Sequence, residues 1–429
     1  MVKAQVRTPE TPEAAAALLA VLPLPAEIRR VAEVLHDAGH DVVLVGGAVR
    51  DCLLGRVHGD WDLASSATPD EVIRLFRRTV PTGIEHGTVT VICGRGDDRV
   101  TTEITTFRGE GEYIDGRRPA EVRFLRALAE DLARRDFTIN AMAWNPLTGV
   151  FTDLFGGLDD LRSGTIRAVG VAATRFAEDG LRAMRAVRFC AALGYSLEPA
   201  TVAAIGGALD TLDQVSRERV QVELIKLLAS PRPSLGLRPM VETSMWGRVL
   251  ADYESAGVEA AIVAVDALPA DPRLRLARLL WPLRGRVRVI EGVLDDRLRP
   301  SREDRSYLLV LCRATNEALA DLEEPAAIRR AVAAIGRRHL ADVLAILEVE
   351  AEQRSRIETA IRDAALTVGE LEIRARDLIA AGLVRPGPII GRLLRGLLQW
   401  VFDEPSRNQG PLLLAEATRR LRDGADLVN

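Results

Sequence analysis

Near the N-terminus, hydrophobic residues recur at two spacings, one typical of helices and the other typical of strands. Ile28, Val31 and Leu35 follow helical spacing and predict a helix over 25–40. The run 41–45 is β-branched and apolar after its first residue, which predicts a short buried strand. Two glycines follow, and the chain then reads as the start of another helix.

The next hundred or so residues continue this mixed pattern. Thr68, followed by a proline and two acids, has the composition of a helix N-terminus. The β-rich runs 87–93 and 99–107 are joined by a short polar loop and predict a hairpin. Segment 131–141 is expected to lead into a helix, and a closing strand is expected at 150–153.

Beyond about residue 160 strand-like runs become rare, and amphipathic helices continue to the end. We therefore predict an α+β fold, with a mixed head followed by an all-helical part. One apolar run, 14–24, is too short to span a bilayer and follows acidic residues, so neither a membrane segment nor a secretory signal is expected.

Composition narrows the class of protein. The chain has 429 residues, of which 48% are hydrophobic and 28% charged, as in globular proteins with more than one domain. The net charge of −4 is not typical of a nucleic-acid-binding protein. It does not exclude one, because binding depends on local rather than total charge. The four cysteines are scattered without metal-ligand or redox spacing, and we expect them to be reduced in a cytoplasmic protein.

Candidate chemistry begins at the end of the first predicted strand. Gly46 and Gly47 would let backbone amides approach a phosphate closely, and Arg50 follows at once. Asp60 and Asp62 lie two residues apart, so on a strand both carboxylates point to the same face. Such a pair suits Mg²⁺. The alternatives are an ordinary tight turn and solvated strand acids, but the combination favours nucleotidyl transfer.

The second strand of the predicted hairpin adds one more acid. Glu103 stands among threonines and is a candidate third carboxylate for the metal site. A solvent-facing strand acid explains it equally well. The segment 108–119, rich in glycine and charge, cannot pack a core and is expected to be a mobile excursion.

A second group of candidate residues lies in the helical part, over 178–189. On a helix Asp179 and Arg182 would be neighbours on one face, and this pair could be no more than a surface ion pair. It could also read a base, because the acid accepts from the amino group of cytosine or adenine and the arginine donates to the ring. Arg185 and Arg188 would then suit a triphosphate or an RNA backbone.

These motifs together resemble those of bacterial class II tRNA nucleotidyltransferases, the CCA-adding enzymes, whose relatives include bacterial poly(A) polymerases. The resemblance rests on the following segments, of which the last is the weakest: 44–51 with Asp60 and Asp62, 134–141, 178–188, 216–223 and 387–414.

The resemblance implies a domain order and a substrate. It implies a polymerase-β-like nucleotidyltransferase head over 25–160 and a helical neck with a nucleotide-selecting helix over 161–230. A helical body and tail over 231–429 would hold the acceptor arm of tRNA. The implied reaction adds C, C and A to the 3′ end of tRNA from CTP and ATP by two-metal displacement with Mg²⁺.

It also implies roles for individual residues. Asp60 and Asp62 would bind the metal ions, and Asp179 and Arg182 would select C and A. The triphosphate would contact an arginine-rich set: Gly47, Arg50, Arg135, Arg185 and Arg188.

Alternatives within and outside the family remain open. Segment 142–145 lacks the aromatic pair that poly(A) polymerases usually place there, and 108–119 resembles the loop that enzymes adding only CC tend to lack. An enzyme that adds only A would keep every motif. A non-catalytic RNA-binding protein would have no use for two like charges such as Asp60 and Asp62.

Overall fold

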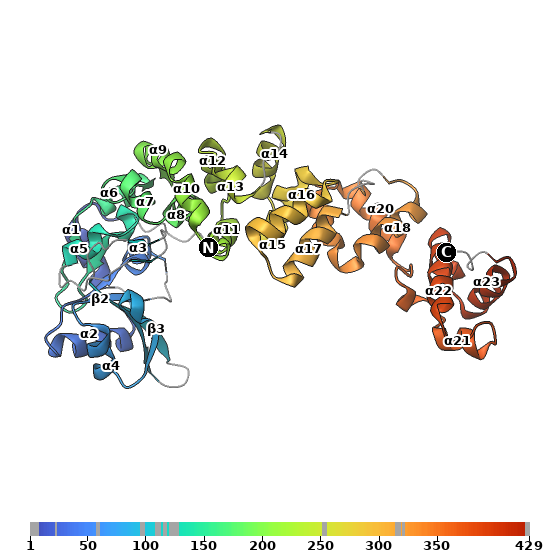
Figure 1. The fold of residues 1–429 in the computed structure, drawn as a ribbon, viewed down its shortest axis with the longest axis horizontal. Coiled ribbons are helices and arrows are strands. Elements are labelled where there is room, and N and C mark those ends of the chain that lie inside the picture. The colour runs from blue at the N-terminus through green and yellow to red at the C-terminus, as the bar shows by residue number, and fades with distance from the viewer. Residues whose placement is uncertain are drawn as a thin grey trace. The chain divides into compact units, whose positions relative to one another are not determined.

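The computed structural model divides into two compact units, Met1–Asp252 and Tyr253–Asn429, and each is described by itself (Figure 1). The residues that it describes are 8–21, 24–56, 61–94, 99–107, 113–114, 118–119, 128–250, 255–313, 319 and 322–424. The predicted division at residues 160 and 230 stays a prediction.

The first unit is built on a seven-stranded sheet with the order β3-β4-β5-β2-β1-β8-β9. Neighbouring strands are antiparallel except β2 and β5, which are parallel. The strands are β1 (Val42–Val45), β2 (Trp61–Ser65), β3 (Thr79–Gly83), β4 (Thr88–Cys93), β5 (Val100–Thr106), β8 (Met142–Trp144) and β9 (Phe151–Asp153).

Five helices accompany this sheet: α1 (Pro12–Ala20), α2 (Ala26–Asp37), α3 (Gly47–Leu53), α4 (Pro69–Leu75) and α5 (Leu128–Ala133). The sheet face that carries Leu63 and Ile104 is buried, and α2 and α4 are the helices that contact β4 and β5. On the opposite face the α5 residue Leu132 packs in a cluster with Val43, Val45 and other buried residues. Beyond this cluster the face carries Asp62, Glu103 and several threonines, together with the apolar Ile92 and Val80.

Most of the elements predicted for the head are confirmed. The helix over 25–40, the strand after it, the helix capped by Thr68 and the 87–107 hairpin all form. The helix expected after 131–141 is wrong: a single 3₁₀ turn leads directly into β8. Every residue of β8 is buried between β1 and β9, so sheet pairing overrides the local pattern. The edge strand β3 was not predicted.

The excursion expected at 108–119 lies mostly outside the described residues. The parts that the structure describes are β6 (Tyr113–Ile114) and β7 (Arg118–Pro119), which pair with each other in antiparallel fashion.

Helices predominate in the remainder of the first unit, with one short pair of strands, β10 (Thr165–Ile166) and β11 (Ser196–Leu197). The helices are α6 (Gly157–Ser163), α7 (Ala172–Glu178), α8 (Leu181–Leu193), α9 (Pro199–Gly207), α10 (Leu209–Gln214), α11 (Arg217–Leu228), α12 (Ser234–Glu242) and α13 (Met245–Val249). Helix α8 packs against α11 and α12. A Cβ at Gly236 would lie 2.3 Å from the Val187 carbonyl oxygen, so only glycine permits this approach.

The second unit is helical throughout its described residues, apart from loops, short 3₁₀ turns and a π-helical turn at Val293–Leu298. Its α-helices are α14 (Ser255–Val265), α15 (Pro272–Leu280), α16 (Val287–Gly292), α17 (Arg302–Arg313), α18 (Pro325–Ile335), α19 (Leu340–Ile346), α20 (Ala351–Ile361), α21 (Ala375–Ala380), α22 (Pro388–Asp403) and α23 (Gly410–Arg422). In the part of the chain that the structure describes, none of the helices has the length and apolar character to span a membrane.

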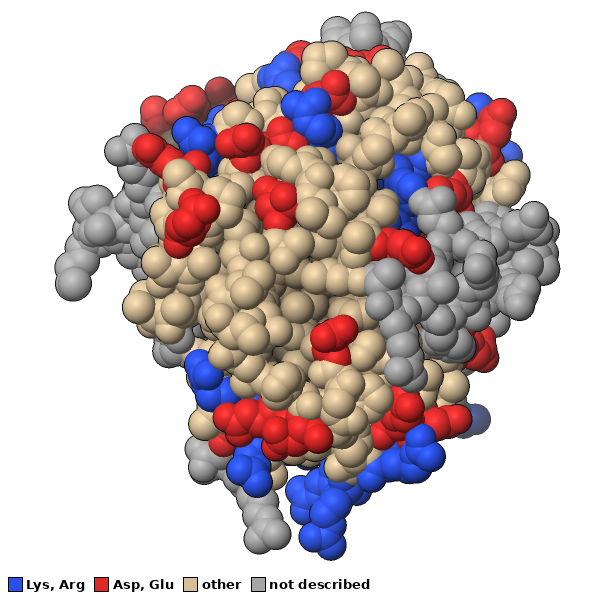
Figure 2. Space-filling view, turned by 90° about the vertical axis from the view of Figure 1, so that its left-hand side faces the viewer, with Lys and Arg blue, Asp and Glu red and all other residues tan. Residues whose placement is uncertain are grey.

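Surface charge is mixed. On the face of the first unit shown in Figure 2, Lys and Arg lie in small groups between groups of Asp and Glu. The four cysteines are free, as expected, and three of them are buried.

One buried arginine joins three helices of the second unit. Arg329 on α18 is 7% exposed. Its guanidinium donates to the carbonyl oxygens of Ala360 (3.2 Å), Phe402 (2.6 Å) and Asp403 (3.3 Å), at the C-terminal ends of α20 and α22. These are groups that a helix leaves without internal partners.

We expect Arg329→Met to lower the free energy of unfolding by about 3 kcal/mol, because three carbonyls at helix ends lose their donor. The neighbouring Arg330 pairs with Asp403 at the surface, so Arg330→Met should cost less than about 0.5 kcal/mol. Urea unfolding followed by circular dichroism measures both values. Equal losses in the two variants would contradict the capping role.

Candidate active site

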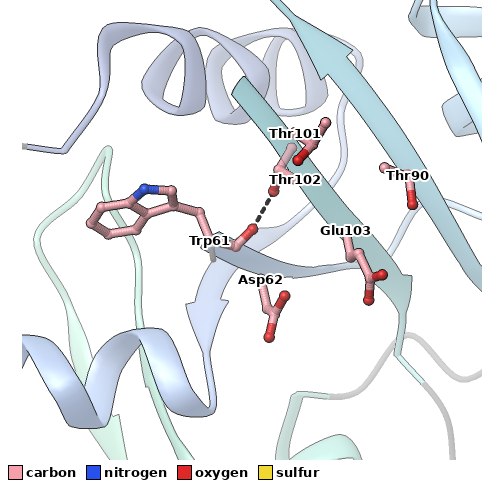
Figure 3. A pocket seen from close by; sticks show the side chains of 6 residues that line it. All are labelled: Trp61, Asp62, Thr90, Thr101, Thr102 and Glu103. Carbon is pink, nitrogen blue, oxygen red and sulfur yellow. Dashed lines mark hydrogen bonds between the residues drawn. The ribbon is translucent and has the colours of Figure 1, made fainter. Parts of the chain in front are cut away.

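Two carboxylates face one cavity on the open side of the sheet. Asp62 on β2 is paired in register with Glu103 on β5, which in turn is paired with Thr90 on β4. Residues directly opposite each other on neighbouring strands project to the same face. Figure 3 shows both carboxylates pointing to one side of the sheet. The cavity measures about 400 Å³ and is lined by Trp61, Asp62, Thr90, Thr101, Thr102 and Glu103.

The alternation along β2 sets the direction of Asp62. The ring of Trp61 points away from the Asp62 carboxylate and lies with Leu44 and Trp144 on the opposite face (Figure 3). The Thr102 hydroxyl donates to the Trp61 carbonyl and ties β5 to β2 at this level. Asp60, the other member of the predicted pair, lies outside the described residues.

The donor set fits a hard divalent cation. Asp62 and Glu103 offer carboxylate oxygens from neighbouring strands, and such oxygens are the preferred ligands of Mg²⁺. Among the residues that the structure describes there is no cluster of three or more metal-ligating side chains.

The glycine turn lies directly beneath two guanidinium groups. Gly46 has φ 67° and ψ −131°, a conformation that favours glycine. A Cβ at Gly46 would come within 3.1 Å of Nη1 of Arg135, and one at Gly47 within 3.6 Å of Nη2 of Arg50. A side chain at Gly46 would crowd Arg135, whereas one at Gly47 would make only an ordinary contact with Arg50.

Arg50 is buried and held by two partners. It donates from Nε and Nη2 to the two carboxylate oxygens of Asp51, at 2.8 and 2.9 Å. Its Nη1 donates to Oδ1 of Asn140 at 2.6 Å, and Nδ2 of Asn140 donates to Oδ1 of Asp136 at 3.1 Å. Asn140 therefore links the arginine at the glycine turn to a buried acid.

Asp136 connects this chain of hydrogen bonds to helix α8. Arg185 approaches Oδ2 of Asp136 with Nε at 2.7 Å and Nη2 at 2.6 Å. Burial alone would raise the pKa of Asp136, but the charge of Arg185 and hydrogen bonds from Asn140 and Arg185 lower it to about 2. Asp136 is therefore ionised at neutral pH.

Asp131 is a second buried acid that binds arginines, here next to the glycine turn. Its carboxylate is fully buried and accepts hydrogen bonds from Arg134 and Arg135, at 2.5 and 3.0 Å. Burial raises the pKa of Asp131, but the two arginines outweigh it and lower the value overall. Nε of Arg135 is buried and has no hydrogen-bond partner among the described residues.

The expected helix over 178–189 is interrupted at the proposed selecting residues. Helix α7 ends at Glu178 and α8 begins at Leu181, with Asp179 in an extended conformation between them. The Asp179 carboxylate accepts from the Leu181 amide at 3.0 Å and from Nη2 of Arg219 at 2.8 Å. Asp179 thus caps the N-terminus of α8 instead of lying within a helix.

Arg182 has partners of its own. Its Nη1 donates to Glu178 at 2.5 Å and to the Arg175 carbonyl at 3.1 Å, and its Nη2 donates to the Arg134 carbonyl at 3.2 Å. Within the described part of the chain the side chains of Asp179 and Arg182 form no ion pair with each other. The simple surface pair that we considered for them is wrong.

The other two neck arginines share one acid. Arg188 pairs with the buried Glu223 on α11 at 2.5 Å, and Arg185 lies 3.9 Å from the same carboxylate. The ring of Phe189 lies beside Arg50, Arg185 and Arg188.

Sequence reasoning missed the roles of several supporting residues, although they stand inside or next to the recognised motifs: Asp131, Asp136, Asn140, Phe189, Arg219 and Glu223. For Asp131 a signal existed, because it precedes Arg134 and Arg135 by three and four residues. Asp136, Asn140, Arg219 and Glu223 bind partners at least 35 residues away, which one sequence does not reveal. Phe189 contacts Arg188 and Arg185, one and four residues before it, as well as the distant Arg50.

Comparisons with known proteins place these features in a family. Residues 42–167 match the family model described as "Poly A polymerase head domain". Residues 194–255 match one described as "Probable RNA and SrmB-binding site of polymerase A".

Two similar curated proteins are both named CCA-adding enzyme. The one from Levilactobacillus brevis is 49% identical over 51% of this chain and 54% of its own length. The one from Lactiplantibacillus plantarum is 37% identical over 91% of this chain and 96% of its own.

A solved structure is similar over nearly the whole chain. It is the Bacillus stearothermophilus CCA-adding enzyme in complex with CTP, with 30% identity and a TM-score of 0.73. The likeness covers 95% of this chain and all of that one.

The lowered pKa of Asp136 predicts a pH-dependent difference in stability. The stabilisation by ionised Asp136 is complete above its ordinary pKa of 3.8 and is lost as the pH falls through about 2. We expect Asp136→Asn to lower the free energy of unfolding by about 2 kcal/mol at pH 7. Wild type and variant should converge between pH 4 and pH 2.

Urea titrations at several pH values measure this difference. Asp159→Asn is the control, because that side chain is 81% exposed and its loss should change little. Parallel pH profiles for wild type and Asp136→Asn would contradict the assignment.

Proposed function

The chain belongs to the family of CCA-adding enzymes, and we propose that its own residues add C, C and A to the 3′ end of tRNA, taken from CTP and ATP. It is a nucleotidyltransferase with an α+β head and a helical remainder. The observation that carries the proposal is the juxtaposition of Asp62, Glu103 and an open cavity on one sheet with the glycine turn at the end of the adjacent strand β1. We also propose the cytoplasm as its compartment, because tRNA and these nucleotides occur there.

The carboxylates form the proposed metal site. Asp62 and Asp60 would hold Mg²⁺, which when bound lowers the pKa of the attacking 3′-hydroxyl and neutralises the leaving pyrophosphate. Asp60 is included because of its spacing from Asp62 in the sequence. Glu103 is a third candidate because it stands directly opposite Asp62 in register.

The arginines around the glycine turn would bind the triphosphate. Gly47 lets the backbone come close, and Arg50 and Arg135 bring positive charge over the turn. The buried Nε of Arg135 keeps a donor available for a ligand. Arg185 and Arg188 would extend this charge along α8. None of these side chains forms a covalent intermediate; they bind and orient the nucleotide.

Asp179 and Arg182 would select the base. Each side chain is fixed by a different neighbour, Asp179 by Arg219 and Arg182 by Glu178. The two side chains are therefore held independently, and in the proposed role both face the edge of the same base. An acid that accepts from an amino group favours cytosine and adenine, and an adjacent arginine donates to the ring. This arrangement rejects uracil and guanine, which present a carbonyl at that position.

Extension assays with nucleotides supplied singly test the reaction. With Mg²⁺, tRNA lacking CCA should gain two residues from CTP alone and a final A when ATP is added. Addition of A alone, and only to tRNA ending in CC, would identify an A-adding enzyme instead. Long A tails on unrelated RNA would identify a poly(A) polymerase.

The metal assignment predicts a loss of turnover without a loss of binding. We expect Asp62→Asn to lower kcat at least about 10³-fold, because the carboxylate charge that holds the metal is removed. tRNA affinity, measured by filter binding, should change less than about 3-fold. Asp70→Asn, an exposed acid on α4, is the control.

Glu103→Gln separates the two interpretations of that residue. A loss of turnover comparable to that of Asp62→Asn would assign Glu103 to the metal site. Turnover like that of the Asp70→Asn control would show it to be a surface acid. Unchanged turnover in Asp62→Asn would overturn the metal assignment altogether.

The selection assignment predicts relaxed nucleotide choice. Asp179→Ala and Arg182→Ala should each reduce the preference for CTP over UTP by about 10- to 100-fold, the value of one good base contact. Arg219→Ala should give a partial effect, because it removes only the group that orients Asp179. Arg162→Ala, at the surface of α6, is the control. Unaltered ratios of kcat/KM in the Asp179 and Arg182 variants would remove the selecting role.

A further inference from the structure

Three guanidinium groups from two parts of the first unit meet at one aromatic ring. The carbon Cζ of Arg188 lies 4.0 Å from the centre of the Phe189 ring, that of Arg50 lies 5.2 Å away, and that of Arg185 lies 5.5 Å away. Arg50 belongs to α3 beside the glycine turn, whereas the other two belong to α8. The geometry points to Phe189 as a positioning residue that sets these arginines for the triphosphate.

The ring itself is firmly held. Phe189 is 4% exposed, and its ring packs edge-on against Phe137 with centres 5.6 Å apart and planes at 79°. Phe137 is fully buried and follows Asp136, the acid that binds Arg185. The ring therefore has little freedom to rotate or shift, and it offers its surface to the cations at a defined position.

The acids around the cluster and the ring at its centre act on different parts of the arginines. Each guanidinium has a carboxylate at its N–H edge: Asp51 for Arg50, Asp136 for Arg185 and Glu223 for Arg188. Those bonds fix where the donors point, and the ring adds a separate contact to each guanidinium. The electron-rich face of an aromatic ring attracts all three cations and opposes their mutual repulsion.

The inference rests on the proposed function, which assigns these arginines to the triphosphate. Loss of the ring should therefore weaken recognition of the phosphates, whereas recognition of the base should be unchanged. Asp179 and Arg182, the proposed selecting pair, are held by Arg219 and Glu178, and the described arginines over the Phe189 ring are Arg50, Arg185 and Arg188.

The test replaces Phe189 by leucine and by tyrosine. Phe189→Leu keeps an apolar side chain but removes the aromatic face, and we expect KM for CTP and ATP to rise about 10-fold. Phe189→Tyr keeps the face and should stay within about 3-fold of wild type. Competition experiments supply the sharper readout: inhibition by cytidine should be unchanged in Phe189→Leu, while the apparent affinity for CTP falls by about 10-fold.

Phe176→Leu is the matched control for loss of packing. Phe176 is fully buried on α7, and none of the arginines that the structure describes lies over its ring, so its replacement should lower the melting temperature without raising KM for CTP. An equal rise of KM in Phe176→Leu, or an equal loss of cytidine and CTP affinity in Phe189→Leu, would overturn the inference. So would unchanged nucleotide affinity in Phe189→Leu. Failure of the proposed function would show differently, as a wild-type protein that does not incorporate CTP or ATP.

Discussion

The arrangement of the candidate site depends on one buried chain of hydrogen bonds. It runs from Arg50 through the Asn140 amide to Asp136 and on to Arg185. Arg50 stands at the glycine turn and Arg185 on α8, so the chain of hydrogen bonds joins the element proposed for phosphate to the helix that follows Asp179 and carries Arg182. Because a buried charge without a partner is costly, each member restricts the positions of the next. The head and this helix are therefore held in one geometry by polar contacts as well as by apolar packing.

The sheet supplies a second constraint, which is independent of the first. Strand pairing in register places Glu103 opposite Asp62, and a shift by one residue would turn Glu103 toward the buried face. That face is fixed by apolar residues such as Leu63 and Ile104, which are almost fully buried. The packing of the core therefore determines where the carboxylates point, although no carboxylate belongs to the core.

The sequence was most informative where local chemistry decides the structure. The glycine turn, the strand before it and the direction of Asp62 relative to Trp61 follow from spacing alone. The sequence named Glu103 but could not give its strand partner, because register depends on distant residues. It failed at 142–144, where pairing with β1 and β9 overrides a helical pattern, and at Asp179, whose carboxylate is held by Arg219 forty residues away. Buried partners such as Asn140 and Glu223 carry no local signal, because their effect depends on contacts across the fold.

The charge balance of the site bears on how it would recognise a nucleotide. Four arginines, Arg50, Arg135, Arg185 and Arg188, face four buried or nearly buried acids, Asp51, Asp131, Asp136 and Glu223. These acids offset much of the arginine charge, although Asp131 is shared with Arg134, and they hold the arginines in place without a nucleotide. A triphosphate that enters such a group gains less from total charge than it would from unpaired arginines. Recognition of the triphosphate must depend instead on N–H groups that already point toward the ligand and on the metal that the nearby carboxylates would hold. The supporting acids therefore contribute to specificity as much as the arginines that they orient.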